Sequence, residues 1–220
     1  MLENRRIVIT GANGGLGRTV CEVAESLGAT TVRLDIKFKE PADNCFEVDL
    51  TDQAALTAVL AGVGDYDGVF NIAGGFAMGG DTWDSDDADW DRMFNLNVNT
   101  LRTVLKVTVP HLLERGRGSI VNVGAYGARE GQAAMSAYVA SKSVVMRLTE
   151  SLANEVRERG VNVNAVLPTV IDTPLNRRDM PDVDPAVWVA PADLANVICF
   201  LASEAARAVH GALVPVRGLS

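Results

Sequence analysis

The sequence predicts an α/β fold: a doubly wound parallel sheet of about seven strands, covered by helices on both faces. Two observations carry this prediction. Short runs rich in β-branched residues alternate with longer amphipathic segments along all 220 residues, and a glycine-rich turn joins the first run to the first such segment. Parallel strands need crossover connections, which are usually helices, and both of their faces must be buried. No linker-like stretch interrupts the chain, so residues 1–220 are expected to form a single domain.

The expected elements follow one another regularly. Strands are predicted at residues 7–10, 31–34, 46–48, 68–71, 119–123, 161–167 and 212–216. Helices are predicted at residues 15–28, 52–62, 86–114, 134–159 and 191–203, with the third broken into two pieces near residues 95–99. Two irregular stretches remain. The glycine-rich connection at 74–89 is expected to be a flexible rim, and residues 172–190 a lid or binding loop.

Composition excludes several classes of function. A formal net charge of −8 would repel the phosphate backbone of a nucleic acid, and no basic stripe offsets it. The first apolar run, residues 7–9, is far too short for a signal or membrane segment. We therefore expect neither nucleic acid nor membrane as a partner, and a cytoplasmic location. The three cysteines lack the spacing of metal ligands and the two histidines stand outside any recognisable cluster, so no metal centre and no histidine-based hydrolase is expected.

The turn at residues 10–17 reads Thr-Gly-Ala-Asn-Gly-Gly-Leu-Gly and opens the first predicted helix. Glycine lets the backbone approach a diphosphate, whose charge then meets the free N–H groups of the helix terminus. The spacing resembles the Thr-Gly-x-x-x-Gly-x-Gly turn of the short-chain dehydrogenases/reductases, which have a Rossmann-type fold. The resemblance implies a nicotinamide dinucleotide as cofactor. Its expected contacts in this turn are Gly11, Asn13, Gly15, Leu16 and Gly17.

Asp35 ends the second predicted strand, where an acid can accept hydrogen bonds from both adenosine ribose hydroxyls and repel a 2′-phosphate. We therefore expect NAD(H) to be preferred. NADP(H) is not excluded, because Arg18, Arg33 and Lys37 lie nearby and would soften the repulsion. The alternative for Asp35 is a purely structural role, in which it caps the strand.

Five more cofactor-binding residues follow from the same resemblance. Asp49, after the third strand, would bond the adenine amino group, and Leu50 would line the ring. Asn71 would steady the sheet after the fourth strand. The backbone of Ala73 and Gly74 would then pass close to the cofactor, which requires small residues.

Tyr138 and Lys142 lie one turn apart on a predicted helix. At that spacing the ammonium should favour phenolate and lower the tyrosine pKa from about 10. Such a pair alone is usually a surface feature, but the resemblance implies that Tyr138 transfers a proton while Lys142 orients the ribose and tunes it. Asn97 aligns with the family asparagine that holds a proton-relay water. Asn95 and Asn99 are rivals for this role, because a small frame shift would exchange them.

One expected residue is absent. The family normally places a serine about thirteen residues before the tyrosine, to hydrogen-bond the reacting oxygen, and this chain has Ala125 there. The nearest possible substitutes are Tyr126 and Ser136. Losing one such donor commonly costs ~10²–10³ in rate. Either the substrate needs less stabilisation, or activity is lost.

Dihydropteridine reductases, the NADH-dependent branch that reduces quinonoid dihydropterins, also lack this serine. Residues 74–80 resemble that branch's Gly-Gly-aromatic segment, and residues 167–181 resemble its stretch after the sixth strand. The resemblance places the start of a substrate lid at residues 176–180. In the stretch 167–181, the expected cofactor contacts are Pro168, Val170 and Thr173, of which the last two would hold the carboxamide. The residues expected to border a flat substrate are Phe76, Met78, Ala125 and Trp188.

The leading hypothesis is NADH-dependent reduction of a small conjugated substrate such as a quinonoid dihydropterin. Two alternatives stay open: a generic alcohol/ketone dehydrogenase, and a dinucleotide-binding scaffold or regulator with weakened chemistry. The helical segments 97–114 and 134–159 carry more small and apolar residues than one core face needs, as in family members that pair subunits through them. A homodimer or homotetramer is therefore expected.

Overall fold

The computed structural model describes residues 1–219 and contains one seven-stranded sheet. The strand order is β3-β2-β1-β4-β5-β6-β7, and every neighbouring pair is parallel. The strands are β1 (Arg6–Thr10), β2 (Thr30–Asp35), β3 (Cys45–Glu47), β4 (Gly68–Asn71), β5 (Gly118–Val123), β6 (Val161–Pro168) and β7 (Leu213–Val216). The predicted doubly wound Rossmann-type fold is confirmed.

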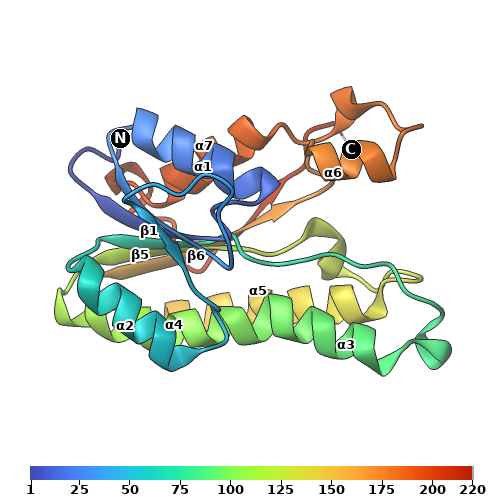
Figure 1. Cartoon of the computed structure of the whole chain (residues 1–220), viewed down its shortest axis with the longest axis horizontal. Coiled ribbons are helices and arrows are strands. Elements are labelled where there is room, and N and C mark those ends of the chain that lie inside the picture. Colours follow the sequence, from blue (N-terminus) through green and yellow to red (C-terminus); the bar gives the residue numbers. More distant parts are fainter. Residues whose placement is uncertain (220) are drawn as a thin grey trace.

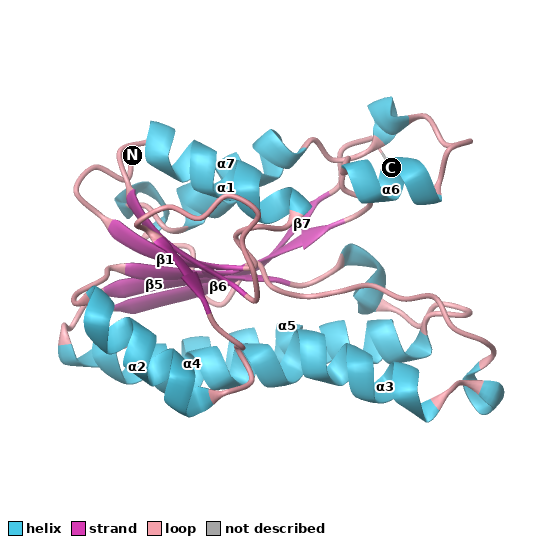
Figure 2. Ribbon diagram, viewed as in Figure 1, coloured by secondary structure: helices cyan, strands magenta, loops and turns pink. Residues whose placement is uncertain are grey.

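Helices cover both faces of the sheet (Figures 1 and 2). On one face lie α1 (Gly15–Ser26) and α7 (Pro191–Leu201), with the short α6 (Pro174–Asp179) beyond them. On the other face lie α2 (Gln53–Val63), α3 (Asp87–Phe94), α4 (Thr100–Glu114) and α5 (Ser136–Val156). Within residues 1–219, no helix is both long and apolar enough to cross a membrane.

The alternation of side chains along β1 explains the two layers. Ile7 and Ile9 are fully buried in the cluster that packs under α1 and α7, whereas Val8 is fully buried in the cluster under the opposite helices. Successive strand residues point to opposite faces, so a strand that is apolar throughout must be covered twice. The central strands are buried in this way, which places the core on both sides of the sheet.

Two predicted details differ from the structure. The expected break near residues 95–99 is a π-helical segment, Asn95–Asn99, that joins α3 to α4 without interruption. A π-helical turn holds one residue more than an α-helical turn, so the helix continues while its buried face shifts. In the sequence, that shift of the apolar pattern looks like a break. The stretch 172–190 is not wholly irregular, because Pro174 starts α6 and the hydroxyl of Thr173 accepts a hydrogen bond from the backbone of Asn176 at 3.2 Å.

Because all strands run parallel, the sheet has two distinct edges. At the carboxyl edge, where the strands end, lie the glycine-rich turn, Asp35, Asn71 and Ala125. At the amino edge, where the strands begin, lie Arg6 and Gly118. Ligands of open parallel sheets bind outside the carboxyl ends of the strands. The candidate site described next occupies that edge.

Candidate active site

The glycine-rich turn is closed against its neighbours so tightly that side chains are excluded. Gly11 has φ +64°, and a Cβ atom there would lie 2.8 Å from the backbone of Ala73. A Cβ atom on Gly17 would lie 2.0 Å from the carbonyl oxygen of Gly11. At Gly15 the nearest atom would be the Thr173 methyl, at 3.3 Å. The glycines therefore let the turn close on itself and pack against the segments that follow β4 and β6.

Asp35 is tied to this turn. Its carboxylate accepts hydrogen bonds from the backbone N–H groups of Asn13 and Ile36, both at 2.8 Å. The bond from Asn13 links β2 to the glycine-rich turn, so Asp35 does more than cap its own strand. The guanidinium of Arg33, which the sequence placed near enough to soften repulsion of a 2′-phosphate, instead forms an ion pair with Glu25 at 2.7 Å. The carboxylate is therefore the fixed charge at the end of β2.

The next expected contacts differ in exposure. Asp49 is exposed, and its carboxylate accepts hydrogen bonds from the hydroxyl and the backbone N–H of Thr51 at 2.7 and 2.8 Å. The hydroxyl bond, and then the backbone bond, lower the pKa of Asp49. Leu50 is buried in the core and lines a small cavity beneath the site. Of the two, Asp49 is the one that is open to a ligand in solution.

The two residues predicted to be catalytic lie on α5, and their electrostatics differ from the expectation. The ammonium of Lys142 is buried and donates a hydrogen bond to the carbonyl of Val123 at 2.8 Å. Burial lowers the pKa of Lys142 to about 8 and raises that of Tyr138 to about 12. The expected lowering of the Tyr138 pKa is absent because burial opposes phenolate and the ammonium bonds a carbonyl. The phenol is therefore protonated at neutral pH.

Asn97 is 2% exposed and its amide links two segments. It accepts a hydrogen bond from the N–H of Gly75 at 2.9 Å and donates to the Gly75 carbonyl at 3.1 Å. It also donates to the hydroxyl of Ser141 at 3.0 Å, which in turn donates to the carbonyl of Tyr138 at 2.7 Å. Sequence reasoning did not single out Ser141. The available signal was a polar residue on the buried face of an amphipathic helix.

The π-helical segment separates Asn97 from its rivals. The side chains of Asn95 and Asn99 hydrogen-bond each other at 3.0 Å, away from Gly75. Gly74 makes room for the buried polar groups, since a Cβ atom there would lie 2.7 Å from Asn97 Oδ1 and 3.1 Å from Lys142 Nζ. Asn97 and Lys142 thus converge on one glycine.

A small cavity of about 10 Å³ lies beside this point, close to the lower limit for one water molecule. Its polar lining includes Asn71, Asn97, Asn122 and Lys142. Asn71 donates to the Asn122 side chain at 2.8 Å, and its own Oδ1 has no hydrogen-bond partner among residues 1–219. Asn122 donates to the hydroxyl of Thr149 at 2.9 Å. The sequence had predicted that Asn71 steadies the sheet, and the hydrogen bond from Asn71 to Asn122 joins β4 to β5.

Ala125 occupies the position after β5 that the missing serine would fill. It is 4% exposed, and it belongs to an apolar cluster against which Tyr138 and Tyr126 pack. The ring of Tyr126, one possible substitute donor, contacts the guanidinium groups of Arg129 and Arg217, which lie 5.0 and 4.7 Å from its centroid. Ser136, the other possible substitute, is the first residue of α5.

The residues expected to border the substrate differ in their exposure to solvent. The ring of Phe76 is 55% exposed and meets Tyr138 edge to face, with centroids 4.9 Å apart. Met78 is 63% exposed. Trp188, by contrast, is 5% exposed, so its ring fills the interior rather than offering an open wall. Burying its large apolar surface stabilises the fold, and the backbone of Trp188 lies beside Gly218.

The segment after β6 lies beside the glycine-rich turn. Pro168 ends β6, and the carbonyl of Val170 accepts a hydrogen bond from Val189 at 2.9 Å. Thr173 contacts the turn through the close approach at Gly15. Within residues 1–219, no three His, Cys, Asp or Glu side chains gather in a way that could hold a metal ion.

Comparison with known proteins agrees with this geometry. Residues 5–184 match the family model described as short chain dehydrogenase. The 2-keto-3-deoxy-L-fuconate dehydrogenase of Xanthomonas campestris is 31% identical over 92% of this chain and 75% of its own. The 2-(S)-hydroxypropyl-CoM dehydrogenase 3 of Xanthobacter autotrophicus is also 31% identical, over 99% of this chain and 96% of its own.

Solved structures share the whole fold. The 3-ketoacyl-(acyl-carrier-protein) reductase of Brucella melitensis, in complex with NADH, matches with a TM-score of 0.88 at 26% identity, over 99% of this chain and 98% of its own. A protein of Beutenbergia cavernae named as an NAD(P)-dependent gluconate 5-dehydrogenase, with NADP bound, matches with a TM-score of 0.87 at 27% identity, over 99% and 96%. By both sequence and structure, the chain belongs to the short-chain dehydrogenase family of NAD(P)-dependent oxidoreductases.

Proposed function

We propose that this enzyme uses NADH to reduce a small, flat, conjugated acceptor, and that a quinonoid dihydropterin is the first compound to test. The observation that carries the proposal is Ala125, a buried methyl group where the family serine would hydrogen-bond the reacting oxygen. A quinonoid acceptor regains aromatic stability when it takes up hydride. It therefore needs less stabilisation of a developing oxyanion than a ketone does.

The state of Tyr138 supports the reductive direction. A phenol with a pKa of about 12 keeps its proton at neutral pH, which is the form a proton donor needs. Lys142, one turn away with a pKa of about 8, also carries a proton at pH 7 and can return one to the phenolate. Asn97 holds the Gly75 backbone and lines the cavity beside Lys142, where it would position a relay water. When bound, the nicotinamide supplies the hydride.

The preference for NADH rests on Asp35. Its carboxylate is held by two backbone N–H groups at the end of β2, so it cannot easily swing away from a 2′-phosphate. The ion pair of Arg33 with Glu25 leaves that guanidinium less free to compensate. Both contacts favour an unphosphorylated adenosine ribose.

The substrate side supports a flat ligand of limited polarity. Phe76 and Met78 expose apolar surface, and Phe76 touches the ring of Tyr138 directly. Aromatic rings prefer offset or edge contacts with other rings, so Phe76 would hold a planar substrate beside the tyrosine hydroxyl.

A generic alcohol/ketone dehydrogenase is the second candidate, favoured by the names of the relatives, which include dehydrogenases of 2-keto-3-deoxy-L-fuconate and of galactitol. The 31% and 30% identity of these relatives leaves substrate-binding loops free to differ. Ala125 separates the two candidates. It also admits the third, a dinucleotide-binding scaffold with weakened chemistry.

The deciding experiment measures initial rates with NADH and NADPH across a quinonoid dihydropterin, quinones and ketones, for the wild type and Ala125→Ser. We expect turnover of a conjugated acceptor by the wild type, and ketone turnover that rises from a trace level by about 10²-fold in Ala125→Ser. Ala128→Ser is the matched control, because Ala128 is equally buried in the same cluster. Efficient wild-type turnover of ketones would establish the second candidate, and NADH binding without any turnover the third.

We further propose that the enzyme assembles as a homodimer or homotetramer through α4 and α5. These are the longest helices of the described chain, with 15 and 21 residues, and they lie together on one face of the sheet. Light scattering across a range of protein concentrations tests this. A monomer at every concentration would contradict it.

A further inference from the structure

A second, larger cavity lies at the amino edge of the sheet, opposite the candidate active site. Its volume is about 930 Å³, within the range of small-molecule sites. It is bordered by the chain before β1, the starts of β5 and β6, and the segment after α7. We call it the amino-edge cavity. Nothing in the proposed reaction uses it.

Arginines dominate the charge of this cavity. Four line it, Arg5, Arg117, Arg157 and Arg207, against the three carboxylates of Glu3, Asp67 and Glu204. Two of these carboxylates are engaged, since Glu3 pairs with the amino group of Met1 and Asp67 pairs with Arg115 and Arg117. Only Glu204 is left to face three guanidinium groups, in a chain whose formal net charge is −8.

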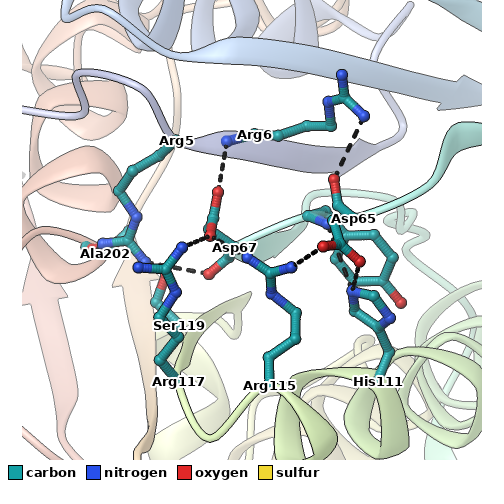
Figure 3. A network of polar contacts seen from close by, with 10 residues as sticks. Arg5, Arg6, Asp65, Asp67, His111, Arg115, Arg117, Ser119 and Ala202 are labelled. Atoms are coloured by element: carbon teal, nitrogen blue, oxygen red, sulfur yellow. Dashed lines mark hydrogen bonds and ion pairs between the residues drawn. The ribbon is translucent and has the colours of Figure 1, made fainter.

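Arg5 is the fixed part of the cluster. Its guanidinium is half-buried and donates to the carbonyl of Ala202, to the carbonyl of Asp67 at 3.0 Å and to the hydroxyl of Ser119 at 3.3 Å. Figure 3 shows that Arg5, just before β1, and Arg117, just before β5, both approach Asp67. None of the three acceptors of Arg5 is a carboxylate oxygen, and within residues 1–219 no carboxylate lies within ion-pair distance of it. Burial lowers the pKa of Arg5, and the attraction of Asp67 and Glu204 from beyond ion-pair distance only partly offsets this.

Two other arginines of the cavity, Arg157 and Arg207, have fewer contacts than Arg5. Arg157 and Arg207 are exposed, and no ion pair is formed by either with any residue of the described chain. Arg157 donates to the side chain of Asn154 at 2.7 Å, which is a neutral partner. One guanidinium held by three hydrogen bonds and two exposed ones thus line the same cavity, and together they can bind one anion.

We infer that the amino-edge cavity binds a small phosphorylated molecule carrying a diphosphate or two phosphate groups. Several planar guanidinium groups around one space match the oxygens of phosphate, which accept paired hydrogen bonds from each fork. This site is separate from the glycine-rich turn, because the two lie at opposite edges of the sheet. It does not depend on the proposed substrate.

The test is calorimetric titration of the whole protein with inorganic pyrophosphate, in the presence and absence of saturating NADH. We expect saturable binding at one site that NADH leaves unchanged, and no such binding when sodium chloride replaces pyrophosphate at equal ionic strength. Absence of saturable binding overturns the inference. Binding that disappears when NADH is added also overturns it, because the pyrophosphate would then occupy the glycine-rich turn.

Variants of the two exposed arginines test whether pyrophosphate binds in the amino-edge cavity. The double variant Arg157→Gln and Arg207→Gln should weaken pyrophosphate binding by at least about tenfold, since each removes a charge-assisted hydrogen bond. Arg92→Gln on α3 is the matched control, because its side chain is 53% exposed and lies outside the cavity. Thermal unfolding checks that all three proteins fold alike. Equal affinity in the double variant and the wild type would overturn the inference.

Glu204→Gln supplies a test in the opposite direction. Removing the one remaining carboxylate should tighten pyrophosphate binding by about threefold, whereas a purely structural cluster predicts no change. Unchanged or weaker binding in Glu204→Gln would count against an anion site.

Discussion

Asp35 shows how one side chain can serve both the fold and the cofactor. Its carboxylate accepts two backbone hydrogen bonds, so a substitution removes structural contacts as well as the charge. We predict that Asp35→Ser lowers the ratio of kcat/KM for NADH to that for NADPH by about tenfold or more, because the 2′-phosphate is no longer repelled. Steady-state kinetics with both cofactors measure this ratio. An equal loss with NADH and NADPH would mean that Asp35 acts only as a structural tie.

Lys142 predicts a pH dependence of stability. Its pKa is about 8 in the folded protein and 10.5 ordinarily, so the unfolded chain binds more protons between these values. The penalty for burying the ammonium is therefore full below pH 8 and vanishes above pH 10.5. Relative to Lys142→Met, the wild type should gain about 3 kcal/mol of unfolding free energy as pH rises through this window.

Chemical denaturation of both proteins at pH 7 and pH 10 measures this gain. Lys106→Met is the control, because Lys106 is exposed on α4 and its substitution should show no such dependence on pH. If the difference between the wild type and Lys142→Met stays constant with pH, Lys142 is not desolvated in solution.

At the scale of elements, the junction of α3 and α4 creates the polar centre. The π-helical segment brings Asn97 into the interior, and the loop after β4 must pass beside it. Gly74 has no room for a side chain at this point. We predict that Gly74→Ala lowers kcat/KM by about tenfold or more, because its Cβ atom would collide with Asn97 Oδ1 and crowd Lys142.

Gly79→Ala in the same loop is the matched control. Its Cβ atom would have only an ordinary contact, 3.9 Å from Asp89, so the same loss of backbone freedom occurs without the collision. Kinetics and denaturation of both variants separate crowding from loop entropy. Similar activity losses in the two variants would attribute the effect to the loop as a whole.

For the whole molecule, periodicity was sufficient to predict the sheet, because most strands are short apolar runs and every crossover except the loop between β2 and β3 contains a helix. Motif spacing also predicted that Tyr138, Lys142 and Asn97 form one site, and in the structure Lys142 and Asn97 both approach Gly74. The raised pKa of Tyr138 could not be predicted, since burial and the direction of the Lys142 ammonium depend on tertiary packing. The cluster around Arg5 was missed for the same reason, because its members come from distant parts of the chain.

Asp67 connects residues that are far apart in the sequence, so its substitution measures how much such contacts contribute to stability. It joins the backbone of Arg6 to Arg115 and Arg117, with contacts of 2.9 to 3.1 Å (Figure 3). Burial alone would raise the pKa of Asp67, but the hydrogen bonds from Arg6 and Arg115 and the charges of both arginines outweigh it and lower the pKa. Its contribution to stability is therefore present above the unfolded pKa and is lost as pH falls through the folded one.

We predict that Asp67→Asn lowers the free energy of unfolding at pH 7 by about 2 kcal/mol, because Arg117 loses its carboxylate and Arg115 loses the more buried of its two. Asp65→Asn is the matched comparison: Asp65 also contacts Arg115, but its side chain is 75% exposed, so its loss should stay below about 1 kcal/mol. Urea denaturation of the three proteins measures both values. Because solvent screens only the exposed pair, added salt should reduce the effect of Asp65→Asn more than that of Asp67→Asn. Equal losses in the two variants would show that burial at the amino edge adds nothing to these ion pairs.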